Sequence, residues 1–149
     1  FHSVCKVTAV QPPFNMLQQD IRDQLLPWCA KNGAAAVTYW PLMKGLLAGK
    51  IRRGHQFDPA DKRLNYEVFQ GDNFDVAQQL LDQLDLIAAE TKKTVAQVVV
   101  NWTFQQPGIT SVLCGAKRDW QINETAGALG WRLSQTQLLK IDACLAEVH

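Results

Sequence analysis

The sequence predicts an α/β protein with a parallel sheet, and two observations carry this prediction. Short apolar or β-branched runs alternate with longer segments of helical periodicity, and a strand, a helix and a second strand already fit within residues 8–39. A unit of this kind contains a crossover helix, which makes its two strands parallel. The strand candidates are also nearly continuous in apolar residues, as is typical of strands covered by helices on both faces.

Each element of the first unit has its own signal. Thr8 to Gln11 is predicted to be a strand, because its β-branched residues run directly into two prolines that end it. Asp20 to Lys31 is predicted to be a helix, since apolar residues recur near helical spacing and Asn32-Gly33 supplies the stop. Ala34 to Tyr39 is an apolar run closed soon afterwards by a proline, which indicates a second buried strand.

The rest of the chain begins with a long connection. Residues 42–73 show no sustained period, and a connection of that length inside a domain is usually functional. The elements predicted after it are a helix from Phe74 to Ala88 with Asp72 or Asn73 as its cap, a helix from Thr94 to Gln105 opened by a capping box at Thr94 and Gln97, a strand from Ile109 to Leu113, a helix from Asp119 to Leu129, and a last helix behind a capping box at Ser134 and Gln137. Three parallel strands leave two open sheet edges, so a closed barrel is not expected from this chain alone.

The length and composition fit one globular domain. The 149 residues are 47% hydrophobic and 19% charged with a net charge of +1, which is too neutral for a nucleic-acid-binding surface. No window is apolar enough to span a membrane and the first residues lack the plan of a signal peptide, so we expect a cytoplasmic protein. The chain starts with Phe1 and not with methionine, which suggests that an upstream segment has been removed.

Cysteines, histidines and most tryptophans are predicted to be structural. The cysteines are scattered and share no helical face with the histidines, so a zinc site is not expected. We expect the cysteines to stay reduced, as in a reducing compartment. The residues predicted to fill the core are Cys5, Cys29, Cys114, Cys144, Trp28, Trp102, Trp120 and Trp131.

Few residues signal chemistry without a family comparison. There is no nucleophilic triad, paired-carboxylate site or glycine-rich nucleotide loop. Ligands of parallel α/β proteins bind at the carboxyl ends of strands, which here read Gln11, Tyr39-Trp40-Pro41 and Cys114 to Lys117. Gly115 and Lys117 at a strand-to-helix turn offer close backbone approach, amide donors and a cation, which suits a phosphate. The alternative, a tight turn at Gly115 and a solvated charge at Lys117, stays equally open.

Six segments in one order carry a resemblance to a known family. They are Val10-Gln11-Pro12-Pro13-Phe14-Asn15, Tyr39 to Lys50, Phe69-Gln70-Gly71-Asp72-Asn73, Val95-Ala96-Gln97 with Asn101-Trp102, Gln106 to Thr110, and Gly115-Ala116-Lys117 through Gln121 and Glu124. With this order and spacing the chain resembles bacterial aldo-keto reductases over essentially its whole length. The resemblance implies a partial (β/α)8 TIM barrel, in which residues 1–149 form the C-terminal, cofactor-binding part with strands six to eight and extra helices. The family transfers hydride between NADPH and a carbonyl group.

The resemblance also implies cofactor contacts. Gln11 matches the glutamine that hydrogen-bonds the nicotinamide carboxamide, and Tyr39 matches the tyrosine that stacks on the nicotinamide ring. The pyrophosphate loop is matched by Trp40, Pro41, Leu42, Lys44 and Gly45. The region around adenosine and its 2′-phosphate is matched by Gly115, Ala116, Lys117, Arg118, Gln121, Glu124 and Thr125. Structural alternatives are a polar strand end satisfied by a loop for Gln11 and a core aromatic for Tyr39.

Two positions depart from the family pattern. Trp40 replaces a serine that many members have, which removes a hydroxyl contact to phosphate, and Thr125 replaces an asparagine that contacts adenine in many members. The basic group of Lys50, Arg52 and Arg53 could add to pyrophosphate binding, but a charge run in a loop is more often a solvated surface, which is the role we expect.

The catalytic residues that the resemblance implies have no counterparts in this sequence. The family's aspartate, tyrosine, lysine and histidine come from the first half of its barrel, so hydride transfer by this chain alone is not expected. Three interpretations stay open: a portion of an NADPH-dependent oxidoreductase, a non-catalytic nucleotide-binding or oligomerising remnant, and a regulatory subunit of the same fold. The expected partners are NADPH and either the N-terminal half of the barrel or a second copy, with no nucleic acid or membrane.

Overall fold

The computed structural model describes residues 2–148 and the side chains of residues 2–146, and it contains a three-stranded parallel sheet. β1 (Ala9–Val10) pairs with β2 (Ala35–Tyr39), and β2 pairs with β3 (Ser111–Leu113). The predicted direction and order of the strands are confirmed. Each strand is shorter than the range predicted for it, because backbone pairing starts later or stops earlier than the apolar run in the sequence.

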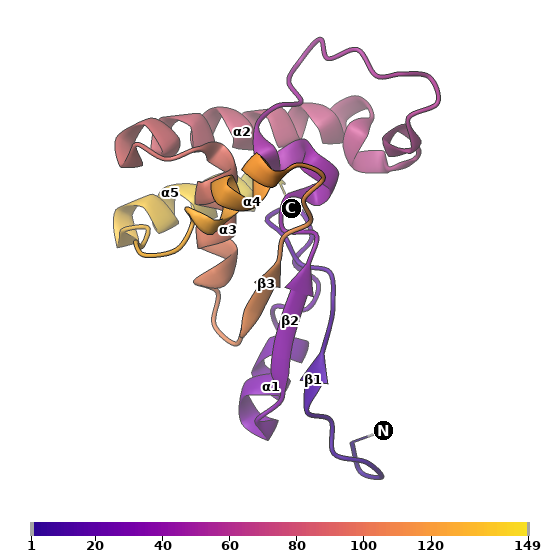
Figure 1. The fold of residues 1–149 in the computed structure, drawn as a ribbon, viewed down its shortest axis with the longest axis vertical. Coiled ribbons are helices and arrows are strands. Elements are labelled where there is room, and N and C mark those ends of the chain that lie inside the picture. Colours follow the sequence, from indigo (N-terminus) through magenta and orange to yellow (C-terminus); the bar gives the residue numbers. More distant parts are fainter. Residues whose placement is uncertain (1, 149) are drawn as a thin grey trace.

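The central strand β2 organises the sheet. Ala9 of β1 lies opposite Ala35, and pairing continues past the end of β1, where the Tyr39 N–H donates to the Pro12 carbonyl and the Phe14 N–H donates to the Tyr39 carbonyl, both at 3.1 Å. The strands therefore point the same way and end on the same side of the molecule (Figure 1). That side is where a parallel sheet places its ligands.

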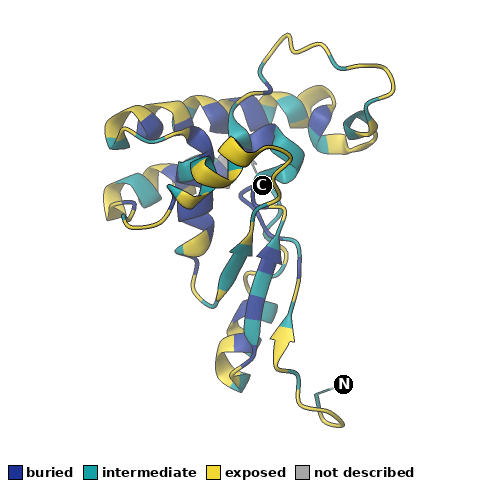
Figure 2. Ribbon diagram, in the orientation of Figure 1, coloured by how far each residue is buried: buried dark blue, intermediate teal, exposed yellow. Residues whose placement is uncertain are grey.

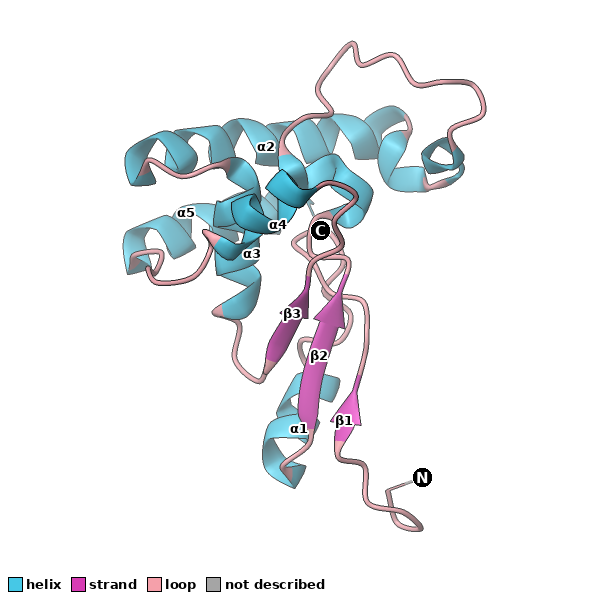
Figure 3. Cartoon of the chain, in the orientation of Figure 1, coloured by secondary structure: helices cyan, strands magenta, loops and turns pink. Residues whose placement is uncertain are grey.

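Helices connect the strands and cover the sheet on the side of β3. The α-helices are α1 (Leu25–Asn32), α2 (Gly71–Thr91), α3 (Val95–Phe104), α4 (Asp119–Ala126) and α5 (Gln135–Val148), and three 3-10 helices are η1 (Met43–Ala48), η2 (Lys62–Asn65) and η3 (Glu67–Phe69). α1 packs beside the starting half of β2, whereas α2, α4 and α5 lie towards the carboxyl ends and α3 extends down beside β3 (Figure 3).

Both predicted capping boxes are confirmed. At the start of α3, the Thr94 hydroxyl accepts from the Gln97 N–H at 3.2 Å, and the Gln97 side-chain oxygen accepts from the Thr94 N–H at 3.0 Å. Ser134 and Gln137 make the same reciprocal pair at 3.3 and 3.0 Å before α5. α1 ends as predicted at Gly33, whose φ of 65° lies in the left-handed region that glycine tolerates.

Four predicted helix boundaries are wrong. α2 continues past the predicted end at Ala88 to Thr91, where Lys92 in the left-handed region ends it. α2 begins at Gly71 with Gln70 as its cap, so Asp72 and Asn73 lie inside its first turn, because η3 leads into the helix with only one extended residue between them. Residues 20–24 form turns ahead of α1 and do not belong to it. α4 ends at Ala126, because the amides of residues 128 and 129 bond to carbonyls three residues back in tight turns.

Most of the core lies among the helices. Its largest cluster joins α2, α3 and α5 and is visible as buried stripes on their inner faces (Figure 2). Fully or nearly fully buried members are Leu80, Leu81, Leu84, Ile87, Val98, Val99, Trp102, Ile141 and Leu145. The Trp102 indole stacks on the Phe14 ring at 5.8 Å with an interplanar angle of 5°, which ties α3 to the segment after β1. A smaller cluster, with Leu26 and Ala36 among its members, joins α1 to β2.

The four tryptophans predicted to be core divide into three groups. Trp102 is buried as predicted, and Trp28 and Trp131 are half-buried against the two clusters. The prediction is wrong for Trp120, whose exposed fraction is 47%. None of the eight described residues of α4 is buried, so the helical stripe that includes Trp120 has no core to pack against.

The cysteines divide in a similar way. Cys29 is buried, Cys114 and Cys144 are half-buried, and burial raises the pKa of the Cys29 and Cys114 thiols. The core prediction is wrong for Cys5, which lies in an exposed stretch before β1. Within residues 2–148, no helix has the length and hydropathy of a membrane span, and no three metal-ligating side chains form a cluster.

Leu84→Ala tests the packing of the main cluster. Leu84 is fully buried on α2, so removing its side chain leaves a cavity, and we expect a loss of roughly 2–5 kcal/mol in the free energy of unfolding. Urea denaturation measures this loss. The control is Leu86→Ala on the same helix, where the leucine is 60% exposed and the expected change is within about 0.5 kcal/mol. Similar losses in both variants would contradict the assigned face of α2.

Self-association tests the open edges of the sheet. Among the described residues, β1 and β3 pair only with β2, so each has one edge whose backbone groups lack strand partners. Because such edges add strands readily, we expect the 149-residue chain expressed alone to form dimers or larger species. Sedimentation velocity at tens of micromolar checks this. A strictly monomeric chain would contradict the prediction.

Candidate functional site

A pocket of about 200 Å³ lies beyond the carboxyl ends of β2 and β3. One wall comes from the segment after β2 and the other from the turn after β3 and from α4, which approach each other in Figure 1. The residues that line it are Leu42, Gly45, Ala48, Lys50, Ile51, Arg63, Gly115, Gln121, Glu124 and Thr125. A larger hollow of about 310 Å³ lies between the end of α3 and residues 128–132 and contains none of the predicted site residues.

The pocket brings together residues predicted from two distant segments. Leu42 and Gly45 come from the predicted pyrophosphate loop, and the predicted adenosine residues on the opposite wall are Gly115, Gln121, Glu124 and Thr125. The remaining predicted residues do not line it: Gln11, Tyr39, Trp40, Pro41, Lys44, Ala116, Lys117 and Arg118. Gln11 is exposed after β1, and Tyr39 is half-buried at the end of the adjacent strand β2. Pro41, within the turn after β2, is buried.

The turn after β2 has an unusual backbone. Trp40, Met43 and Lys44 have φ values of 61°, 39° and 53°, and Gly45 has a φ of 93°. Non-glycine residues in this region cost about 1–3 kcal/mol each and persist only where the surroundings fix them. Here the Met43 N–H donates to the Trp40 carbonyl and the Gly45 N–H donates to the Leu42 carbonyl, both at 2.9 Å. A wound turn of this kind is typical of ligand-binding segments.

Lys44 links this turn to the long connection. Its ammonium lies 3.6 Å from the centroid of the Trp40 ring and 4.2 Å from that of Tyr66. Trp40 is 38% exposed and packs edge to face on Tyr39 at 5.1 Å, so the indole that replaces the family's serine is held against a cation and an aromatic ring. Two aromatic faces therefore hold the Lys44 ammonium beside the turn.

The turn after β3 is closed by a side chain of α4. The Gln121 side-chain oxygen accepts from the backbone N–H groups of Lys117 at 2.7 Å and Arg118 at 3.0 Å. Gly115 lies outside the left-handed region, and a Cβ built on it meets no atom within 4 Å. Neither strain nor packing therefore requires glycine at this position, whereas close approach of a ligand to the backbone does favour it. The side chains of Lys117 and Arg118 are exposed.

The basic group after η1 divides between two roles. Lys50 lines the pocket, where its ammonium lies 3.8 Å from the Glu124 carboxylate and 4.0 Å from the Trp120 ring, so it bridges the two walls. Arg52 and Arg53 turn away to α2, where they pair with Asp85 at 2.7 Å and Asp82 at 2.9 Å. The exposed Trp120 ring therefore contacts a cation and not the core.

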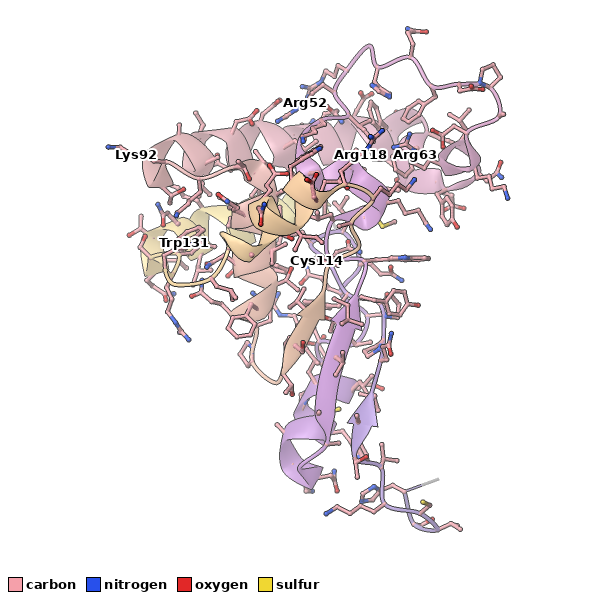
Figure 4. The ribbon with its side chains drawn as sticks, in the orientation of Figure 1. Arg52, Arg63, Lys92, Cys114, Arg118 and Trp131 are labelled. Carbon is pink, nitrogen blue, oxygen red and sulfur yellow. The ribbon has the colours of Figure 1, made fainter. Side chains whose placement is uncertain are left out.

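Sequence reasoning missed Arg63 on the pocket wall. Its guanidinium binds Asp61, which caps η2, and Figure 4 shows Arg63 and Arg118 at the same end of the molecule although they come from different segments. The Arg63 guanidinium lowers the pKa of Asp61 to about 2 through a side-chain hydrogen bond. The Asp-x-Arg spacing signals a capped turn, but nothing local signals that this turn reaches the pocket.

Parallel strands with a pocket at their carboxyl ends define a part of an α/β barrel with a ligand site at the expected end. The sequence profile of the Aldo/keto reductase family matches residues 1–146, and the chain belongs to this family. The predicted family and the predicted partial barrel are confirmed.

Individual relatives agree with this assignment. The chain is 29% identical over 146 residues to the aldo-keto reductase YhdN of Bacillus subtilis, covering 97% of this chain and 44% of YhdN. It is 31% identical over 125 residues to the NADH-specific methylglyoxal reductase of Escherichia coli, covering 84% of this chain and 38% of that protein. The glycerol dehydrogenase AKR11B4 of Gluconobacter oxydans superposes with a TM-score of 0.90 at 29% identity, over 98% of this chain and 44% of that structure. The chain thus spans less than half the length of these relatives.

The pKa of Asp61 tests the ion pair on the pocket wall. A lowered pKa means that the pair stabilises the fold above the ordinary carboxyl pKa and loses this effect as the pH falls through about 2. We expect NMR of the side-chain carboxyl carbon at about pH 3 to find Asp61 mostly ionised in the parent and clearly less ionised in Arg63→Met, where the pKa rises toward about 3.9 because the side-chain hydrogen bond is lost and only the backbone one remains. Arg53→Met is the control and leaves Asp61 ionised. A protonated Asp61 in the parent at this pH would contradict the pair.

Proposed function

We propose that this chain is the NADPH-binding portion of an aldo-keto reductase, an oxidoreductase that transfers hydride between NADPH and an aldehyde or ketone. The observation that carries the proposal is the pocket, because both of its walls contain residues that match cofactor contacts of the family. Membership of the family supports a nicotinamide cofactor.

The residues of the pocket fit a dinucleotide. Lys50 and Arg63 on the wall and Lys44 beside it are cations that suit a diphosphate. The open space beside Gly115 lets a phosphate or ribose approach the backbone closely. In this assignment the turn at residues 40–45 and Lys50 hold the diphosphate, and the adenosine is held by Gly115, Gln121, Glu124 and Thr125.

The nicotinamide end is assigned to the strand ends. Gln11 directly follows β1 and Tyr39 is the last residue of the neighbouring strand β2, so we assign the nicotinamide ring to the space over these two strand ends. The Gln11 amide has a donor and an acceptor, which match a carboxamide, and the Tyr39 ring can stack on the nicotinamide. When bound, NADPH supplies the hydride, and these two side chains fix which face of its ring is presented.

The residues of this chain bind and orient the cofactor but supply no proton to a carbonyl oxygen. The residues that line the described pocket include no histidine and no tyrosine. Their one lysine, Lys50, pairs with Glu124. We assign the general acid to residues outside this sequence, in the part of the barrel that the family builds from its first half.

NADH is the competing cofactor, and two observations favour it. The Escherichia coli relative is named as NADH-specific, and the Gln121 side chain occupies the amides of Lys117 and Arg118 that a 2′-phosphate would otherwise use. The choice of NADPH is supported by the exposed side chains of Lys117 and Arg118, two cations next to each other in the turn where the family binds the adenosine. Their charges stay available while Gln121 holds the backbone.

Calorimetry with both nucleotides tests the cofactor choice in the protein as its gene encodes it. A charge-assisted hydrogen bond contributes roughly 1.5–3 kcal/mol, so we expect NADPH to bind about ten- to a hundred-fold more tightly than NADH. Lys117→Ala and Arg118→Ala should weaken the binding of NADPH and leave the affinity for NADH unchanged. Lys31→Ala, at the end of α1 and far from the pocket, is the control.

Each other result has a defined meaning. Equal affinities for the two nucleotides in the parent, or equal losses for both in the variants, would show that this turn does not read the 2′-phosphate. A parent protein that binds neither nucleotide would reject the proposed function itself.

A further inference from the structure

The connection between β2 and α2 carries an acidic residue that the cofactor proposal does not explain. Asp61 is the N-cap of η2, where one carboxylate oxygen accepts from the Arg63 backbone N–H at 2.9 Å. The same carboxylate also accepts from the Arg63 side chain, from Nε at 3.0 Å to each oxygen and from Nη2 at 2.5 Å. One short turn therefore fixes both the backbone and the guanidinium of Arg63.

An aromatic ring restricts the guanidinium further. Arg63 Cζ lies 5.4 Å from the centroid of the Phe57 ring, and Phe57 packs edge to face on the buried Phe69 at 5.8 Å. Phe57 is itself packed against the main core cluster. The guanidinium is thus held along one edge by a carboxylate and over one face by a ring that is anchored to the core.

Donors of Arg63 remain available beside the pocket. A guanidinium has five N–H donors, and Asp61 uses those of Nε and part of those of Nη2. Nη1 makes no hydrogen bond to any residue that the structure describes, and Arg63 lines the pocket together with Gly45 and Lys50. An anion in the pocket can therefore meet an oriented guanidinium edge.

We propose that Asp61 is a positioning residue of the phosphate site, which holds the Arg63 guanidinium so that its unused donors bind a phosphate of the nucleotide. This inference rests on the proposed cofactor function and adds to it a role for the connection. We assign Arg63 to the diphosphate of the nucleotide. Tyr66, three residues after Arg63, has its ring centroid 4.2 Å from the ammonium of Lys44, which belongs to the turn assigned to the diphosphate. The adenosine residues lie on the opposite wall.

The direction in which Asp61→Asn changes nucleotide affinity distinguishes a positioning role from an effect of charge alone. Asp61 stays ionised at neutral pH, and a negative charge near a phosphate repels it. Asp61→Asn removes this charge with little change in size, so it tightens nucleotide binding if Asp61 acts only through its charge. If Asp61 positions Arg63, the same variant weakens binding, because asparagine carries no charge and has one acceptor oxygen, whereas the two carboxylate oxygens accept separately from the Arg63 backbone N–H and from its guanidinium.

The experiment is calorimetry of NADPH and NADH binding to the protein as its gene encodes it, with thermal unfolding recorded for every variant. We expect Asp61→Asn to lower the affinity for both nucleotides roughly three- to ten-fold, and Arg63→Met to lower it about ten-fold or more. The double variant should bind like Arg63→Met alone, and Asp61→Glu should recover part of the affinity. Arg53→Met is the matched control, since Arg53 lies on the same connection and pairs with Asp82 away from the pocket.

The outcomes are distinct. Equal losses for the two nucleotides support the diphosphate, and a loss confined to NADPH supports the same role for Asp61 at the 2′-phosphate. The positioning role is overturned if Asp61→Asn binds the nucleotides as tightly as the parent does or more tightly. It is also overturned if adding Asp61→Asn to Arg63→Met weakens nucleotide binding further. Failure of the parent to bind either nucleotide overturns the proposed function and this inference with it, whereas an unaffected Asp61→Asn in a binding-competent parent overturns this inference alone.

Discussion

The pairing of β2 with a strand on each side is the constraint on which the candidate site depends. Tyr39 at the end of β2 is joined through backbone hydrogen bonds to the segment after β1, and Thr110 exchanges backbone and side-chain hydrogen bonds with Ala36 at 2.9 and 3.2 Å. Because the strands are parallel, the turn at residues 40–45 and the turn at Gly115 must leave the sheet on the same side. Gly45 and Gly115, which are 70 positions apart in the sequence, therefore meet at one pocket.

Tertiary contacts anchor the connection from residue 49 to α2 at its start. Gly49, with a φ of 77°, lies so close to Val95 that a Cβ would meet the valine side chain at 3.0 Å. Gln78 of α2 is fully buried and donates to the Ile51 carbonyl at 3.2 Å. These contacts fix the start of the segment that contains Arg63, so the helical core helps to determine one wall of the pocket.

The sequence predicted those features of the fold that depend on residues close together in the chain and on the regular geometry of β/α units. The capping box at Thr94 needs only a hydroxyl and an amide three residues apart, and the strand order follows from the handed, parallel geometry of β/α units. Strand-end geometry also predicted a ligand site at Gly115, and the family resemblance added Gln121; both residues line the pocket. It failed for Arg63 and Trp120, whose positions depend on where two separate segments meet, and no periodicity within either segment contains that information.

The cations around the pocket differ in how they are held, and this difference divides their physical roles. Lys44 is held by the faces of Trp40 and Tyr66, which carry no net charge, so its full positive charge acts on an anion at a distance. Arg63 is held by a carboxylate that cancels most of its long-range field, so it acts only at hydrogen-bonding distance, where the direction of its donors matters. Lys50 lies between these cases, because it has both a ring and a carboxylate as neighbours. In the proposed phosphate site, Lys44 would attract the anion and Arg63 would fix its orientation, and both side chains are already held in place by neighbouring residues.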